Sequence, residues 1–163
     1  MGLAVMNASQ GTVTITHHFG TIEVSEEAMM TFPTGGLFGF ERVTQFALLP
    51  AARQGLWWLI APNADATTFV LADPFVLDGD YAIDLGEREG ADLALDDAND
   101  AFALVMLTLP EGAAPTANMR APIVFNLAKR LAAQVVSRDE SHELQKPANL
   151  ALYPLQEGGV SLA

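Results

Sequence analysis

The residues best suited to chemistry are carboxylates, and they are concentrated in one segment. From Asp78 to Asp100 the chain carries nine acidic residues and one basic residue, Arg88. The first part of this segment spaces its acids roughly as a calcium-binding loop does, but the sixth position, which requires glycine, is Ile83. We therefore expect no metal there. The acids are either a solvated face or a docking surface for a basic protein.

The constellations typical of catalytic and cofactor sites are missing from the rest of the sequence. There is no cysteine, which excludes disulfides, thiolate metal sites and cysteine nucleophiles. There is also no nucleophile elbow, phosphate-binding loop, dinucleotide fingerprint or zinc-protease motif. His17 and His18 are neighbours on a predicted strand, so their side chains point to opposite faces and do not easily share a metal. We expect a binding protein without cofactors rather than an enzyme.

Composition and charge narrow the class of protein and of partner. With 163 residues, 50% of them hydrophobic, the chain can form one domain with a sizeable core. Its formal net charge of −12 repels phosphate backbones and anionic membranes, so we expect neither nucleic acid nor a membrane as a direct partner. No secretory signal is visible, and no apolar run approaches the roughly 20 residues of a membrane helix. These features indicate a cytoplasmic protein.

Short strands are the elements that must position these residues. Alternating patterns predict a hairpin from 12–17 and 21–24, and Ser25 has the type of a helix N-cap before one helical turn over 26–30. Further strands, each an apolar run, are predicted at 45–49, 56–60, 68–72, 104–109, 123–125 and 131–136. A short helix with ragged ends is expected within 86–99, and an edge strand or coil over 150–155. Turn signals at about ten-residue spacing favour an all-β fold, a barrel or a sandwich.

Three stretches admit two interpretations each. The glycine-rich and aromatic run 32–41 is either core packing under a tight loop or a docking loop. Trp57 and Trp58 are adjacent, so on a strand they face opposite sides, and the inward one fills the core unless both line a ligand site. The run 116–126 places Asn118, Arg120 and Pro122 between two buried strands, which suits a binding surface on a rigid scaffold. Asn118 and Asn126 could instead cap turns, and Phe75 could belong to the core.

Six landmarks in order resemble the FliW family of flagellar assembly factors, over residues of about 12 to 141. They are His18 to Val24, Phe32-Pro33-Thr34-Gly35 closing in Gly39-Phe40-Glu41, Leu48-Leu49-Pro50, Trp58-Leu59, Asp73-Pro74-Phe75 and Thr116 to Asn126. The sequence departs from the family in the longer Gly35-Gly36 loop. Residues 1–11 read as an N-terminal extension, 12–141 as the FliW-like domain, and 142–163 as a C-terminal tail with a possible edge strand.

The resemblance implies a single small antiparallel β-barrel-like domain with short helical turns and no catalytic activity. It also implies two partners: the translational regulator CsrA, an RNA-binding dimer that represses flagellin synthesis, and flagellin, between which such a protein switches. Eight residues are then expected to form the partner surface or its support: Asp73, Phe75, Asp78, Asp80, Asn118, Arg120, Pro122 and Asn126. The alternative function is a small β-barrel ligand-binding module or carboxylate-based hydrolase with a site near Trp57 and Trp58.

Overall fold

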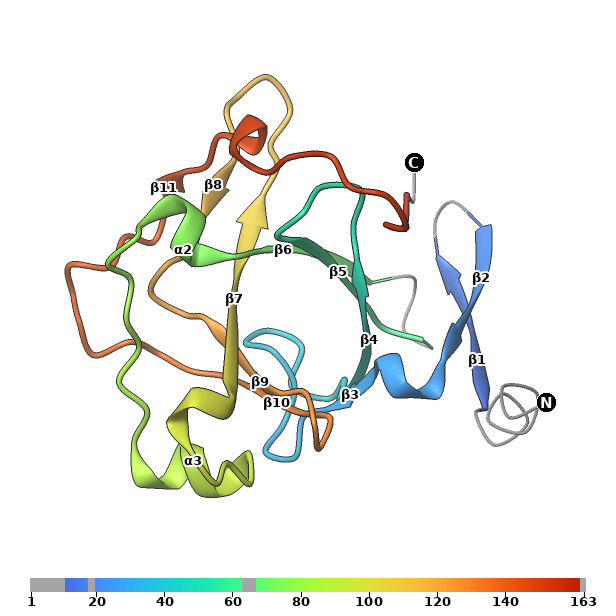
Figure 1. Cartoon of the computed structure of the whole chain (residues 1–163), viewed down its shortest axis with the longest axis horizontal. Coiled ribbons are helices and arrows are strands. Elements are labelled where there is room, and N and C mark those ends of the chain that lie inside the picture. The colour runs from blue at the N-terminus through green and yellow to red at the C-terminus, as the bar shows by residue number, and fades with distance from the viewer. Residues whose placement is uncertain (1–10, 18–19, 63–66, 162–163) are drawn as a thin grey trace.

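A closed barrel of seven strands forms the centre of the computed structural model, which describes residues 11–17, 20–62 and 67–161 (Figure 1). In the order in which they pair, the barrel strands are β7 (Ala101–Thr108), β6 (Thr68–Ala72), β5 (Leu56–Ile60), β4 (Gln45–Pro50), β3 (Met29–Thr31), β10 (Leu131–Gln134) and β9 (Ile123–Asn126). Pairing of β7 with β9 closes the ring. Each pairing in the ring is antiparallel except β3 with β10, where Thr31 lies opposite Leu131. The all-β barrel prediction is confirmed.

The remaining elements lie outside this ring. The hairpin of β1 (Thr12–His17) and β2 (Gly20–Ser25) forms its own sheet beside the barrel, and β8 (Thr116–Ala117) and β11 (Lys146–Pro147) extend the barrel sheet from β7. The helices are short: α2 (Pro74–Leu77), α3 (Glu87–Asp92), and the 3-10 turns η1 (Glu26–Ala28), η2 (Ala98–Asp100) and η3 (Leu150–Leu152). In Figure 1, α2 and α3 lie on the side of the barrel opposite the hairpin.

The barrel wall is apolar on both faces, which is why its strands appear in the sequence as nearly continuous hydrophobic runs. Side chains such as Phe46, Leu59 and Phe125 fill the interior and are fully buried. Alternate residues point outward and are covered by three separate segments. The hairpin packs through Ile15 on one part of the outer face, the acidic segment through Leu93 on a second, and the C-terminal tail through Tyr153 on a third.

Most predicted strands are present, with differences at their ends. The strands at 56–60 and 68–72 have the predicted bounds, and the hairpin is confirmed with β2 extended to Ser25. The strand predicted at 131–136 ends at Gln134, because the next residue, Val135, lies opposite Pro122. Val135 still donates to the Pro122 carbonyl oxygen at 2.9 Å, but proline has no N–H to continue the pairing. The strand expected at 104–109 begins earlier, at Ala101, and ends at Thr108.

Two helical predictions hold only in part. The turn expected over 26–30 is the 3-10 turn Glu26–Ala28, since Met29 already belongs to β3. The helix expected within 86–99 is confined to Glu87–Asp92, because Ala94 adopts a φ of 51°, which no helix accommodates. Residues 150–155 contribute the 3-10 turn η3 rather than an edge strand, although Leu155 forms an isolated bridge with Arg53.

The loop over 32–41 packs part of its apolar residues into the core, and its role as a docking loop stays a prediction. Phe32 and Leu37 are buried in the barrel interior, whereas Phe38 and Phe40 are 55% and 40% exposed. Gly36 is required by close backbone approach, since a Cβ there would lie 2.1 Å from the Val43 carbonyl oxygen. Residues 1–10 and His18, which carry most of the predicted extension and half of the histidine pair, lie outside the described residues. The division at residue 141 stays a prediction.

Candidate functional site

The turn α2 displays two apolar side chains to solvent. Asp73 caps it, its Oδ1 accepting a hydrogen bond from the Phe75 N–H at 2.9 Å, and Pro74 occupies the first helical position. The carbonyl oxygen of Asp73 also accepts from the Tyr153 hydroxyl at 2.8 Å, which anchors the turn to the tail. The cap leaves Phe75 and Val76 53% and 40% exposed. The sequence landmark is thus a rigid turn that presents an aromatic residue.

The chain leaving α2 places carboxylates beside these apolar groups. Asp78 Oδ1 accepts a hydrogen bond from the Asp80 N–H at 3.0 Å, which fixes a tight turn. Tyr81 then points inward, and its ring meets that of Phe75 edge to face with centroids 6.0 Å apart. We call Asp73, Phe75, Val76, Asp78 and Asp80 the α2 face. Four of the eight predicted site residues therefore lie together.

The other four predicted residues hold the loop 116–126 in place. Asn118 Oδ1 accepts from the backbone N–H groups of Arg120 and Ala121 at 3.1 and 3.2 Å. The Arg120 guanidinium donates to the carbonyl oxygens of His142 and Glu140 at 3.0 and 2.7 Å. Asn118 thus has the turn-capping role that the sequence left open for it, and Arg120 ties the loop to residues 140–142.

Pro122 and Asn126 are both buried. Asn126 is 4% exposed, and its Nδ2 donates to the carbonyl oxygens of Leu93 and Ala94 at 2.9 and 3.3 Å. It thereby ties the acidic segment to β9. Pro122 offers its carbonyl oxygen to Val135. The structure does not bring Asn126 to the α2 face, although each of the eight residues remains a prediction as a partner contact or its support.

Charge near the α2 face is largely uncompensated. Of the nine acids from 78 to 100, only Asp96 forms an ion pair within the described part of the chain, with Lys129 at 3.6 Å. Among the described residues, Asp78, Asp80 and Asp84 form no ion pair. An opposite charge brought by a partner would therefore meet carboxylates that make no competing ion pair.

A hollow of about 290 Å³ lies next to the α2 face. Its walls are Phe75 together with Ile83, Asp84, Leu85, Ala101, Ala103 and Val124. The sequence did not lead us to predict that residues 81–85 take part in this site. In this segment Tyr81, Ile83 and Leu85 alternate with polar or small residues. This period of two marks an extended segment with one side packed on the barrel, and it was obscured by the surrounding acids.

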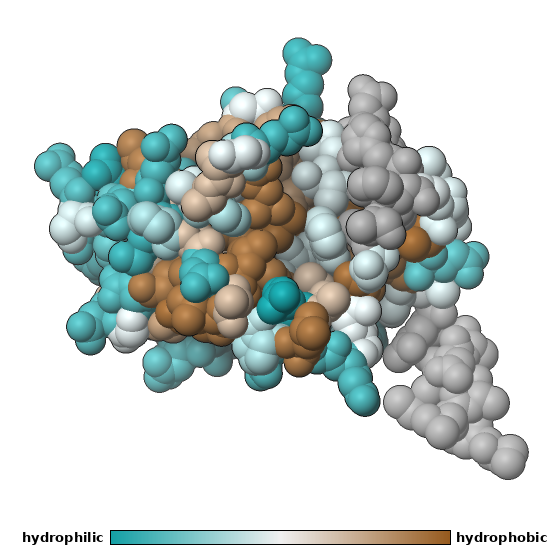
Figure 2. Space-filling view, turned by 90° about the horizontal axis from the view of Figure 1, so that it is seen from above, coloured by the Kyte–Doolittle hydropathy of each residue, from teal (hydrophilic) through white to brown (hydrophobic). Residues whose placement is uncertain are grey.

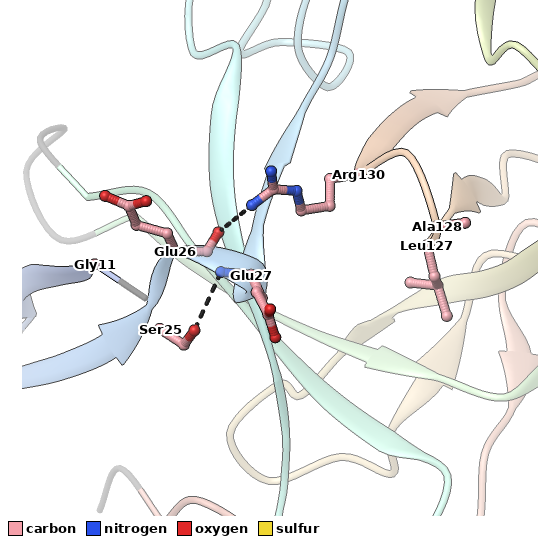
Figure 3. A pocket seen from close by; sticks show the side chains of 7 residues that line it. All are labelled: Gly11, Ser25, Glu26, Glu27, Leu127, Ala128 and Arg130. Carbon is pink, nitrogen blue, oxygen red and sulfur yellow. Dashed lines mark hydrogen bonds between the residues drawn. The ribbon is translucent and has the colours of Figure 1, made fainter. Parts of the chain in front are cut away.

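Two further hollows have different linings. One of about 520 Å³ lies between η1 and the turn before β10 (Figure 3). There Arg130 donates to the Glu26 carbonyl oxygen at 3.1 Å, while Leu127 and Ala128 lie across from the two glutamates. The other, of about 430 Å³, is bordered by Pro115, Pro147 and the start of η3. It belongs to the end of the molecule where β8, β11 and η3 lie, and Figure 2 shows a hydrophobic area crossing this end.

Neither tryptophan lines any of these three hollows. Trp57 packs toward the barrel interior, where its ring meets Phe102 edge to face at 5.7 Å. Trp58 lies on the outer face and donates its indole N–H to the Val160 carbonyl oxygen at 2.8 Å. The two side chains thus face opposite sides of the wall, as predicted, and do not form the shared platform that the alternative ligand site requires.

Within the described residues, no three His, Asp or Glu side chains are placed to hold a metal ion. None of the helices there is long and apolar enough to cross a membrane. Burial raises the pKa of Tyr81 and Tyr153 well above the usual value, with Asp78 and Asp73 adding to the effect, so both phenols stay neutral.

Comparison with known proteins gives one consistent result. A family model described as FliW protein matches residues 13–148. The flagellar assembly factor FliW of Pseudothermotoga lettingae is 32% identical over 128 residues, which cover 77% of this chain and 81% of that protein. Its counterpart in Natranaerobius thermophilus is 33% identical over 134 residues, covering 80% and 87%. A crystal structure of the flagellar assembly factor FliW matches with a TM-score of 0.74 and 32% identity, covering 88% of this chain and 98% of that one.

Proposed function

The chain belongs to the FliW family of flagellar assembly factors, and from this premise we propose that it is a non-enzymatic cytoplasmic regulator with two protein partners. One partner is a CsrA-type translational regulator, whose repression of flagellin messenger RNA the chain antagonises. The other is flagellin. When export lowers free flagellin, the chain passes from flagellin to the regulator, and flagellin synthesis resumes.

The α2 face is the observation that carries this proposal. It combines exposed apolar side chains, Phe75 and Val76, with carboxylates that have no ion pair among the described residues. A regulator that binds RNA must carry basic side chains for the phosphates, so an acidic surface attracts it over a distance. Apolar contact then supplies close packing once the two proteins meet.

The loop 116–126 supports this face rather than contacting the partner in our proposal. Asn118 and Arg120 use their side chains to fix the loop and the tail, and Met119 accepts the hydrogen bond that positions Tyr81. Asp73, Phe75, Asp78 and Asp80 are the proposed contacts. By fixing the loop that holds Tyr81, the polar residues of the loop keep these contact residues in position.

The decisive experiment measures release of RNA from the regulator. Labelled flagellin leader RNA is bound to the purified CsrA-type regulator, the chain is added, and the bound fraction is followed by gel shift. We expect RNA to be released, and added flagellin to restore the repressed complex. If the chain binds neither protein at micromolar concentration, the proposed function is wrong.

Charge variants separate steering from contact. The double variant Asp78→Asn/Asp80→Asn should slow association with the regulator several-fold at low salt and change dissociation little. Glu23→Gln, on the exposed part of the hairpin at the opposite side of the barrel, is the matched control and should leave the rate unchanged. An association rate indifferent to ionic strength would show that these acids do not steer the encounter.

A further inference from the structure

The hollow beside the α2 face owes its depth to two alanines. β7 points Val105 and Leu107 outward, and both are buried under the tail. Earlier in the same strand the outward residues are Ala101 and Ala103, which line the hollow. β7 thus carries large outward side chains where the tail covers it, and small ones at Ala101 and Ala103. The small side chains leave unfilled volume between the barrel wall and residues 83–85. The cavity is thus a property of β7 itself.

The size and lining of this hollow suit one amino-acid side chain. Its volume of about 290 Å³ lies at the lower limit for small-molecule pockets, of about 300 Å³. Six of the seven lining residues are apolar, and the seventh is Asp84. Asp84 is exposed, and its carboxylate makes no hydrogen bond or ion pair to any described residue. The occupant therefore needs an apolar stem and a cationic end.

Phe75 favours arginine over lysine as the side chain that supplies this cationic end. Phe75 lines the hollow and is 53% exposed, so an incoming side chain can reach it. A planar guanidinium stacks on an aromatic ring and can pair with a carboxylate through two N–H groups, whereas an ammonium is a compact and strongly hydrated charge. Anchor residues of this kind, seated in a pocket, carry much of the free energy of protein association.

From these observations we infer that the hollow is an anchor pocket for an arginine side chain of a basic protein partner. The methylenes of the arginine pack against Ile83, Leu85 and Val124, and its guanidinium lies between the Phe75 ring and the Asp84 carboxylate. The net charge of −12 favours a basic protein as the owner of this side chain. The identity of that protein rests on the proposed function, whereas the pocket itself does not.

Short peptides test the pocket without a partner protein. Blocked Gly-Arg-Gly is titrated into the full chain, and amide shifts of Ala101, Ala103 and Asp84 are followed by NMR. We expect saturable shifts confined to the hollow, with affinity at least about tenfold weaker for the citrulline, lysine and leucine peptides. Equal binding of the lysine or citrulline peptide, or tighter binding of the leucine peptide, would overturn the assignment to arginine.

Two variants and one control distinguish binding in the pocket from attraction by the acidic surface as a whole. Ala103→Leu fills the hollow and should abolish the shifts, and circular dichroism establishes that it folds. Asp84→Asn changes an exposed side chain and should weaken the arginine peptide about tenfold, while Asp100→Asn removes the same charge at an exposed residue outside the hollow and should have little effect. If Asp100→Asn weakens binding as much as Asp84→Asn, only the acidic field is involved and the inference fails.

The same variants distinguish this inference from the proposed function. Binding of the regulator or flagellin to the wild-type chain but equally to Ala103→Leu, with no saturable peptide shifts, would remove the pocket and leave the function standing. Saturable arginine-peptide binding together with no binding of either protein would remove the function and leave the pocket. Loss of partner binding in Ala103→Leu together with peptide binding by the wild type would support both.

Discussion

The Tyr81 hydroxyl donates a hydrogen bond to the Met119 carbonyl oxygen at 2.7 Å, and both residues are buried. This contact joins the acidic segment to the loop 116–126, which lies 38 positions away along the chain. The Tyr81 ring also lies against that of His142, with centroids 4.7 Å apart. The acidic segment, the loop 116–126 and the C-terminal tail therefore meet at Tyr81, beneath the α2 face.

Replacing Tyr81 with phenylalanine tests this junction. The ring packing is kept, but the buried Met119 carbonyl loses its donor, so we expect a loss of about 1–3 kcal/mol in the free energy of unfolding. Urea denaturation measures it. The partner-binding surface should also loosen, which hydrogen exchange at residues 78–81 would report. An unchanged urea midpoint would mean that water replaces the hydroxyl without cost.

Alkaline pH should destabilise the fold through its two tyrosines. Burial raises the pKa of Tyr81 and Tyr153 above the usual tyrosine value of about 10. The unfolded chain therefore loses these protons first as the pH rises, so the stabilisation is complete below about pH 10 and declines as the pH moves toward the folded values. Urea midpoints at about pH 8 and about pH 11 should differ, and Tyr81→Phe should reduce the difference. A midpoint that rises with pH over this range would contradict the argument.

Asn126→Ala should cost more than a change at an exposed cap. Asn126 is buried and donates to the carbonyl oxygens of Leu93 and Ala94. The Ala94 oxygen keeps a second donor in Lys129 Nζ at 2.8 Å, but the Leu93 oxygen loses the buried Asn126 donor, so alanine should destabilise the protein by about 2–3 kcal/mol. Asn149→Ala is the control, since Asn149 is exposed and caps η3 through one bond to Ala151 at 3.0 Å, with an expected cost of about 0.5–1 kcal/mol. Thermal unfolding of both variants measures the difference. Equal decreases in Tm would show that the hydrogen bond to Leu93 stabilises the protein no more than the exposed cap does.

Gly36→Ala and Gly90→Ala should act in opposite directions. A methyl group at Gly36 would meet the carbonyl oxygens of Val43 and Phe40, which are backbone atoms that cannot move aside without shifting the loop. We expect this variant to lose about 2 kcal/mol or more. Gly90 lies within α3, with open space at its Cβ position, so alanine there should stabilise by about 0.5–1 kcal/mol. Parallel denaturant titrations compare the two.

Strands were predictable wherever an apolar run was long enough and a turn residue ended it. Leu56 to Ile60 is such a run before Pro62, and its bounds were found from the sequence. β3 is only three residues long, and β8 and β11 only two, so no pattern distinguishes them from coil. These strands depend on partners supplied by distant parts of the chain.

The candidate site was predictable only in part, for a related reason. Asp73 and Phe75 were found because the Asp-Pro-Phe landmark is local, and the cap of α2 needs only neighbouring residues. The hollow beside them arises where Ala101 and Ala103 of β7 lie under residues 83–85, which is a tertiary relationship without a local signal. The role of Asn126 likewise depends on Leu93, 33 positions earlier in the chain.

The parallel pairing within the barrel ring has a consequence for synthesis of the protein. Thr31 pairs with Leu131, about 100 positions later, so a growing chain cannot close the barrel until most of it has left the ribosome. Until then β3 is paired with β4 alone, and its other edge is open to strands of neighbouring chains. Contacts this distant in sequence also slow folding. The strand that completes the ring is therefore among the last to be translated, and nascent copies depend on prompt completion to avoid aggregation.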